Sequence, residues 1–359
     1  MIMSGKIFSW LTTAIICSLL LTAGCAPLAK ETAKPEVKPE EEKPKVMVEE
    51  VKPEVEIEEQ VPTVELALKF TPQDSTTYKV VTEAQRSVKW EGPLPDESVF
   101  REGHNKNRIE IIFTQQVQST DEEGNAVAKI TIEELKYLSV IKDNPILDFD
   151  STREKDRNNP LAKLIGQSYT IEIAPTGKVT KVIDVIQAQA AVKGRSPAHK
   201  TALALLKPGV IKQRHGILAL PVTDKNQLHT GDNWSSVKTF NFGLMGSKSY
   251  EKIYTVKKIK DQDKRKVAIV EMNAIPSSEM AEQLHKEQVP AIFSKMFDNI
   301  ETYTGRLELD LTAGKVEKYV EKLQSEWLAV DPLAGQKDDK EPAAVRMSST
   351  RFYSLEKID

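Results

Sequence analysis

Side chains able to carry out chemistry are few in this 359-residue sequence, and most of them are poorly spaced for it. The five histidines have none of the short H-x-H, H-x-x-x-H or H-E-x-x-H spacings that bring two imidazoles to one zinc ion. No G-x-S-x-G, G-x-x-x-x-G-K-[ST] or G-x-G-x-x-G string occurs, so the sequence lacks the glycine-containing turns typical of acyl-transfer enzymes and nucleotide-binding proteins. The sequence therefore predicts a protein that is not an enzyme and that uses neither a metal nor a cofactor. The histidines are His104, His199, His215, His229 and His285.

One loop is rich in carboxylates. Asp148, Asp150 and Asp156, with a threonine among them, place oxygen atoms at alternate positions, as a calcium loop does. Arg153 stands where an EF-hand needs glycine, and Asn159 stands where it needs glutamate. We expect a weak surface calcium site at most, with a solvated loop as the alternative.

The same loop contains the string D-F-D-S-T, which resembles the first motif of haloacid dehalogenase-type phosphatases. In that family one aspartate is the nucleophile, the next is the acid and base, and a helix follows. Here the charged run R-E-K-D-R-N-N-P follows instead, with no strand and helix alternation to hold the other motifs. A hydrolase is therefore the least favoured of the function classes.

The N-terminus has the composition of a secretory signal. Lys6 precedes an apolar run over residues 7–21, which is too short for the roughly 20 residues of a membrane-spanning helix. The run ends in L-T-A-G-C, which resembles the bacterial lipobox, although Thr22 stands where leucine is commonest. The resemblance implies that residues 1–24 are removed by cleavage between Gly24 and Cys25, and that Cys25 carries a lipid anchoring the protein in the membrane.

This anchor has consequences for location and for cysteine chemistry. Cys17 falls in the signal, so the mature body contains neither a free thiol for catalysis nor a disulfide. The residue after the anchor, Ala26, is not the aspartate that retains some lipoproteins in the inner membrane. The sequence therefore predicts a lipid-anchored protein of the cell envelope that faces the periplasm, on the outer membrane rather than the inner.

Residues 25–62 differ from the rest of the chain in amino-acid composition. They consist almost entirely of Pro, Glu, Lys, Val and Ala, and such a composition cannot bury enough apolar surface to offset chain entropy. We expect a disordered tether, or alternatively an acidic arm that binds a partner. The whole chain has a net charge of −3, and most of the acidic excess lies in this segment. The body therefore lacks the large positive charge that attracts nucleic acid.

Beyond the tether, apolar residues recur at every second position, as in V-E-L-A-L-K-F and R-I-E-I-I-F-T-Q-Q-V. This period predicts half-buried antiparallel strands. Helical spacing occurs over Val182–Leu206, with a break near Gly194, and over Ser277–Phe297. We expect a first β-rich module over residues 63–222 and a second over residues 223–359.

The two modules contain a repeat. I-E-I followed by T-G-K-V, from Ile171 to Val179, matches L-E-L followed by T-A-G-K-V, from Leu307 to Val316, with one residue added at Ala313. Gly177 and Gly314 are expected to occupy equivalent turn positions with positive φ. The body therefore resembles a duplicated β-module.

The runs F-D-S-T, N-P-L-A-K-L-I-G-Q-S-Y-T-I-E-I and T-G-D-N-W resemble an uncharacterised family of bacterial envelope lipoproteins, over most of residues 64–325. The architecture is also loosely similar to the half-barrels of lipoprotein carriers. These resemblances imply an α+β, β-dominated fold of two related curved antiparallel sheets, each covered by helices. The expected function is to bind an apolar or lipidated ligand without catalysis, and the alternative is a structural or protein-binding scaffold of the envelope.

Overall fold

The computed structural model describes six stretches of the chain: residues 63–92, 102–221, 227–262, 264–277, 298–330 and 344–358. They belong to one compact unit, Glu59–Asp359. The predicted signal, Cys25 and the tether lie outside the described residues, as does nearly all of the helix expected over Ser277–Phe297. None of the helices that are described is long and apolar enough to cross a membrane.

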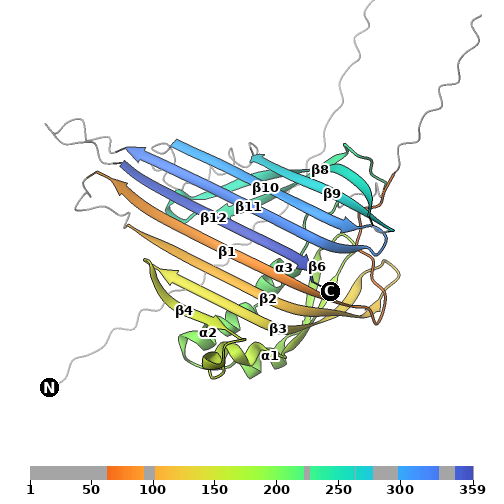
Figure 1. Ribbon diagram of the computed structural model, residues 1–359, viewed down its shortest axis with the longest axis horizontal. Helices are drawn as coiled ribbons and strands as arrows, with labels where there is room; N and C mark the ends of the chain where they lie inside the picture. Colours follow the sequence, from red (N-terminus) through yellow and green to blue (C-terminus); the bar gives the residue numbers. More distant parts are fainter. Residues whose placement is uncertain are drawn as a thin grey trace, which may run out of the picture. The chain divides into compact units, whose positions relative to one another are not determined.

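Within these stretches, twelve antiparallel strands form a single sheet (Figure 1). Its order is β6-β5-β3-β2-β1-β12-β11-β10-β9-β8-β7, with β4 paired to β3 beside this path. The strands are β1 (Ser75–Glu91), β2 (Gly103–Thr120), β3 (Ala126–Ile141), β4 (Asn144–Asp150), β5 (Ser168–Ile173), β6 (Val179–Asp184), β7 (Asn233–Asn241), β8 (Ser247–Gln262), β9 (Arg265–Pro276), β10 (Asp298–Asp310), β11 (Lys315–Val330) and β12 (Ala344–Lys357).

The expected dominance of β-structure is confirmed, but the two expected sheets are one. β1 pairs with β12 along its length, from Tyr78 opposite Lys357 to Glu91 opposite Ala344. Each half of this sheet is a meander, β1-β2-β3-β5-β6 in the first and β7-β8-β9-β10-β11 in the second. The matched segments lie in β5 and β10, the fourth strand of each meander. The predicted boundary between residues 222 and 223 lies outside the described residues.

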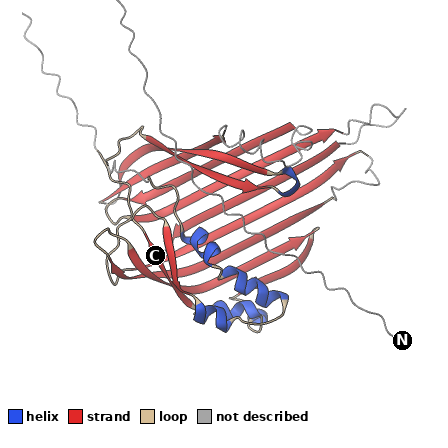
Figure 2. Ribbon diagram, turned by 180° about the vertical axis from the view of Figure 1, so that it is seen from behind, coloured by secondary structure: helices blue, strands red, loops and turns tan. Residues whose placement is uncertain are grey.

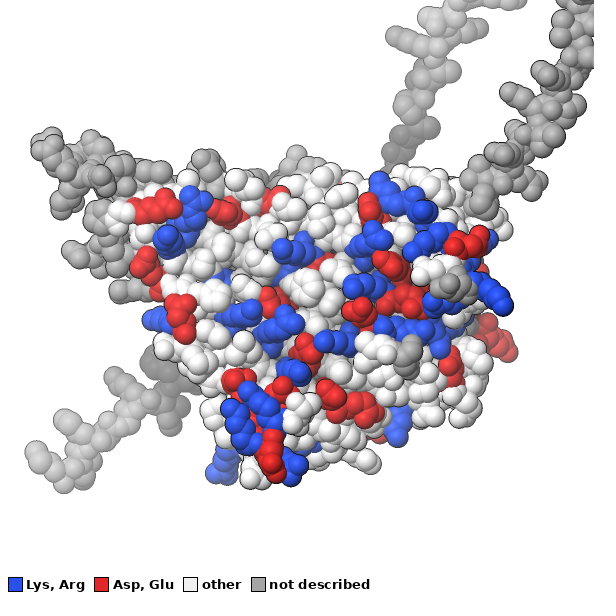
Figure 3. Space-filling view, in the orientation of Figure 1, with Lys and Arg blue, Asp and Glu red and all other residues white. Residues whose placement is uncertain are grey.

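Alternation along the strands separates a buried inner face from a charged outer face. On β1, Tyr78 and Val80 are buried inward, whereas Lys79 and Glu83 point outward. The outer residues pair across strands, as Lys79 does with Glu110 at 2.9 Å. Figure 3 shows the result on the face opposite the helices, where basic and acidic side chains are interspersed over the sheet. Such a face remains solvated and is not an apolar docking surface.

The three α-helices of the described residues lie together on the inner face of the first half (Figure 2). Pro197 and Pro208 begin two of them, because proline fixes a helical φ where no N–H bond is needed. Helix was predicted from Val182, but Val182 belongs to β6 and pairs with Ile171, so the helix starts later. The elements are α1 (Ile186–Ala191), α2 (Pro197–Leu205) and α3 (Pro208–His215), with 3₁₀ turns η1 (Glu154–Asp156), η2 (Pro160–Leu164) and η3 (Gly243–Met245).

The second half of the sheet curls back over its own inner face. Arg351 on β12 and Asn241 on β7 lie five strands apart, which would separate them by about 24 Å in a flat sheet with strands ~4.8 Å apart. Arg351 Nη2 nevertheless donates a hydrogen bond to the carbonyl oxygen of Asn241 at 2.6 Å. Lys238 on β7 likewise reaches Glu321 on β11, four strands away, at 3.1 Å. The inner face is therefore strongly concave.

Candidate ligand-binding groove on the inner face

A groove remains on the inner face between α3 and the curled β7–β8 hairpin. It contains two cavities. The inner cavity, of about 350 Å³, is lined by residues of β1, β2, β7, β10, β11 and β12 and by Gln213 of α3. The outer cavity, of about 290 Å³, lies toward the β1–β2 connection and includes Val88, Phe242, Met245, Trp327 and Met347. Cavities of this size are in the range of small-molecule sites.

Aromatic side chains form the wall that β7 and η3 contribute. The Phe240 ring is edge-on to that of Tyr303, with centroids 5.6 Å apart. The Phe242 ring is edge-on to that of Trp327 at 5.2 Å. Trp327 is 3% exposed, and its Nε1 has no hydrogen-bond acceptor among the described residues. The wall is thus apolar, and the buried N–H group of Trp327 remains available to donate a hydrogen bond.

A buried cluster of charged residues around Glu321 lies beside this aromatic wall. The Glu321 carboxylate accepts from Lys252 Nζ at 2.9 Å, from Lys238 Nζ at 3.1 Å and from the Tyr303 hydroxyl at 2.8 Å, and it also contacts the Tyr319 hydroxyl. Burial alone would raise the pKa of Glu321, but the charges of Lys238 and Lys252 lower it to about 2. At neutral pH this carboxylate is therefore ionised and fully engaged, which suits a structural role better than proton transfer.

Two arginines lie where the two cavities adjoin. Arg351 lines the inner cavity and Arg86 lines the outer one. Both donate to the same acceptor, the carbonyl oxygen of Asn241, at 2.6 Å from Arg351 and 3.4 Å from Arg86. The Arg351 guanidinium also stacks on the rings of Phe240 and Phe242, at 4.9 and 5.4 Å from their centroids.

A second polar network closes the helix side of the groove. The Tyr169 hydroxyl and His215 Nε2 are 2.6 Å apart, and Arg214 Nη1 donates to the same hydroxyl oxygen at 3.3 Å. The Tyr353 hydroxyl donates to the Arg214 carbonyl oxygen at 2.9 Å, which ties α3 to β12. Burial and the Arg214 charge lower the pKa of His215 well below its usual value, so the imidazole is neutral.

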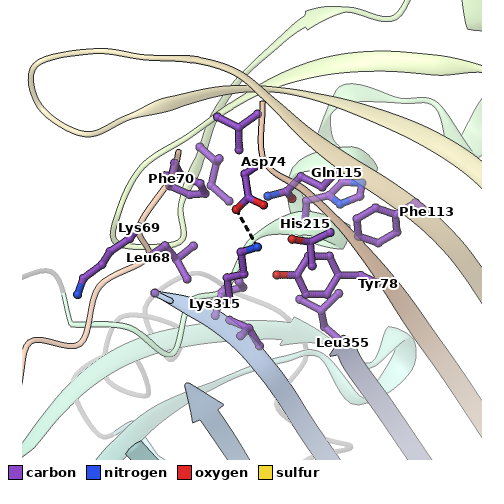
Figure 4. A pocket seen from close by; sticks show the side chains of 16 residues that line it. Leu68, Lys69, Phe70, Asp74, Tyr78, Phe113, Gln115, His215, Lys315 and Leu355 are labelled. Atoms are coloured by element: carbon purple, nitrogen blue, oxygen red, sulfur yellow. Dashed lines mark ion pairs between the residues drawn. The ribbon is translucent and has the colours of Figure 1, made fainter. Parts of the chain in front are cut away.

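A third pocket is too small to bind more than water. It has a volume of about 30 Å³ and lies where the chain enters the sheet (Figure 4). Lys315 pairs with Asp74 across it at 2.7 Å. Beside it, the Leu68 and Lys69 amides donate to the carbonyl oxygens of Pro175 and Gly314. This entry segment thereby ties together the two turns that the repeat relates.

The carboxylate loop is organised around an arginine. Arg153 donates two hydrogen bonds to the Asp148 carboxylate, at 2.9 and 3.1 Å, and one to Asp156 at 2.7 Å. Asp150 accepts from the backbone and hydroxyl of Thr152. Hydrogen bonding to Arg153 lowers the pKa of Asp148. Arg153 therefore pairs with two of the loop's three aspartates. The described residues contain no group of three or more acidic, histidine or cysteine side chains that could hold a metal ion.

The other residues singled out from the sequence lie in varied places. Gly24 and Cys25 are outside the described residues. His104, at the start of β2, lies beside Asp143, and His229, before β7, lies beside Asp232; neither lines the groove.

The groove residues themselves were not identified from the sequence. The available signal was a charged residue at an inward position of the alternation, as Glu321 is between Tyr319 and Leu323, and as Lys252 is between Tyr250 and Tyr254. A charged residue at an inward-facing position of a strand indicates a buried charge cluster or a binding site.

Comparisons with known proteins give only weak likenesses. No protein-family model matches the chain, and no curated protein matches it in sequence. A solved structure described as "Lipid-protein interactions in lipovitellin" is 9% identical over 81% of this chain and 26% of that chain, with a TM-score of 0.34. DynF from the dynemicin biosynthesis pathway of Micromonospora chersina is 7% identical over 87% of this chain and 93% of that chain, with a TM-score of 0.18. At these scores neither likeness bears on the function of the groove.

Proposed function

We propose that this protein is a non-catalytic, lipid-anchored protein of the bacterial cell envelope that binds an apolar or lipid-like ligand in the groove. The observation that carries the proposal is the pair of cavities of about 350 and 290 Å³ on the concave face. Most of the inner face is filled by helices or by the curled sheet, whereas this region is open. Its lining combines aromatic and aliphatic side chains with polar and charged ones. The anchor on Cys25 rests on the lipobox resemblance.

The chemistry of the walls supports binding without catalysis. Glu321, the buried acidic residue of the inner cavity, is held ionised by two lysines. The tyrosines beside it have raised pKa values, because burial and the Glu321 charge disfavour their phenolate forms. Neither kind of group can exchange a proton readily near neutral pH. Apolar surface, by contrast, is plentiful, and its removal from water drives binding.

A variant that fills the outer cavity tests the proposal. Val88 faces inward and lines this cavity, while the next residue, Lys89, is exposed on the outer face. Val88→Trp should fill the cavity, and Lys89→Trp is its matched control. The uncharged probe is the methyl ester of cis-parinaric acid, a fluorescent polyene, titrated into the full chain while energy transfer from tryptophan is followed.

The wild type and Lys89→Trp should bind the ester with equal affinity, and Val88→Trp should bind it at least tenfold more weakly. Thermal melts establish that both variants are folded. Equal binding by Val88→Trp, or no binding by the wild type, would contradict the proposal that the groove holds apolar ligands.

A further inference from the structure

Arg351 and Arg86 differ from the lysines around Glu321 and Glu301 in having no carboxylate partner among the described residues. Lys238 and Lys252 pair with Glu321, and Lys248 pairs with Glu301 at 2.7 Å. Arg351 and Arg86 form no ion pair among the described residues, and the acceptor they share is one neutral carbonyl group, that of Asn241. Each guanidinium carries five N–H donors, so most of their donor capacity is unused.

The two positive charges also act on each other. Burial, and secondly the charge of Arg86, lower the pKa of Arg351. Arg351 is half-buried, so water screens this repulsion less than on the surface. An anion placed between the two guanidinium groups would remove the repulsion and take up the unused donors at once.

The Arg351 guanidinium is also held in a defined orientation. Phe240 and Phe242 lie against it, and its hydrogen bond to the Asn241 carbonyl fixes one edge. A guanidinium stacked on aromatic rings keeps its in-plane N–H groups available, and these match the paired oxygens of a carboxylate or phosphate. A side chain fixed in this way loses little further entropy when an anion binds.

The apolar space begins at the same point. Phe242 contacts Arg351 on one side and lines the outer cavity with Val88, Met245, Trp327 and Met347. One face of the junction is thus cationic, and the other leads into an apolar cavity of about 290 Å³. This arrangement matches a molecule with a charged group at one end and an apolar body at the other.

We propose that the groove binds an anionic amphipath, with its carboxylate or phosphate on Arg351 and Arg86 and its apolar body in the outer cavity. This inference rests on the proposed function, since it names the chemical class of the ligand. The ester titration above tests the apolar cavity alone, so the two claims can fail separately.

The test compares cis-parinaric acid with its methyl ester at pH 8, using the full chain. The wild type should bind the acid at least tenfold more tightly than the ester. Arg351→Gln should weaken acid binding by about 10- to 100-fold, the loss expected for hydrogen bonds to a charged group, and should weaken ester binding much less, so that the preference for the acid is lost. Arg86→Gln should act in the same direction with a smaller effect, because Arg86 is more exposed.

Matched controls separate head-group recognition from folding. Arg346 lies on the same strand as Arg351 but on the outer face, where it pairs with Glu91 at 3.1 Å and with Glu326. Arg346→Gln should leave both affinities unchanged. Persisting ester binding also reports that Arg351→Gln is folded, and Arg351→Lys should retain part of the preference for the acid.

Three results would overturn the inference. Equal affinity of the wild type for acid and ester would show that no anion is recognised. An equal loss of acid and ester binding in Arg351→Gln would show that Arg351 only supports the groove. Displacement of the acid by an equimolar concentration of inorganic phosphate would show a site for free anions and not for amphipaths.

Discussion

The buried side chain of His215 should make the free energy of unfolding depend on pH. Arg214 donates to the Tyr169 hydroxyl oxygen, which leaves the hydroxyl proton for His215 Nε2. The imidazole is therefore an acceptor at Nε2, and its Nδ1 is buried with no partner among the described residues. Protonation would break the bond to Tyr169 and add a positive charge beside Arg214, so the pKa of His215 is lowered in the folded state, first by burial and then by the Arg214 charge.

The sign of the effect follows from the direction of this shift. Because the unfolded chain takes up the proton near pH 6.5 and the folded chain does not, the stability is complete above pH 6.5 and is lost as the pH falls below it. Between pH 7.5 and 5.5 the loss from this one group is at most about 1.4 kcal/mol, the limit set by protonation of the imidazole in the unfolded chain.

Urea denaturation at pH 7.5, 6.5 and 5.5 measures this loss. His215→Gln keeps a hydrogen-bond acceptor for Tyr169 but cannot titrate, so its free energy of unfolding should fall less than that of the wild type over the same interval, by up to about 1.4 kcal/mol. The other four histidines are common to both proteins and cancel in the comparison. Identical pH dependence in wild type and variant would refute the assignment of a buried, neutral imidazole.

Three further predictions concern the turns, the charge cluster and the anchor. Gly177→Val and Gly314→Val should each lower stability by about 1–3 kcal/mol from backbone strain at positive φ. They should lose more through collisions, because an added Cβ would lie 2.5 Å from the Ile217 oxygen at Gly177 and 2.5 Å from the Lys69 nitrogen at Gly314. Gly166→Val, at positive φ in open space, should show the strain alone in thermal melts. Glu321→Gln should lower the free energy of unfolding by about 3–5 kcal/mol, because it leaves buried lysine charge uncompensated, and a loss below 1 kcal/mol in urea would contradict the buried cluster. Cys25→Ser should abolish labelling by radioactive palmitate in growing cells, and normal labelling would exclude the lipid anchor at this position.

Local features of the fold were predictable because their causes are local. Alternating apolar residues correctly predicted β2 from R-I-E-I-I-F-T-Q-Q-V, but V-E-L-A-L-K-F, residues 64–70, forms only an isolated bridge between Val64 and Leu228. Both turn glycines have positive φ, +74° for Gly177 and +64° for Gly314, as the repeat predicted. The union of the two halves was not predictable, since it depends on pairing between Tyr78 and Lys357, residues at opposite ends of the body. No local pattern distinguishes an edge strand from one that joins two meanders.

The groove was harder to predict for a related reason. Its essential contacts join strands distant in the sheet, such as Arg351 with Phe240, and they exist only because the sheet curls. Curvature results from twist and from bulges such as the one between Val256 and Lys258 on β8, which the sequence does not mark. Helix prediction failed at Val182 for another reason: apolar spacing there satisfied both periods, and pairing with Ile171 favoured the strand.

Native mass spectrometry of the full chain, purified without added lipid, tests the central claim most directly. The account predicts that the wild type and Lys89→Trp retain one bound anionic amphipath, which dissociates under collisional activation as an acid or phosphate with an apolar body. Val88→Trp, with its outer cavity filled, should carry none. A wild-type protein without any bound molecule, or a Val88→Trp variant with the same bound mass as the wild type, would contradict the claim that this groove is a binding site for amphipathic ligands.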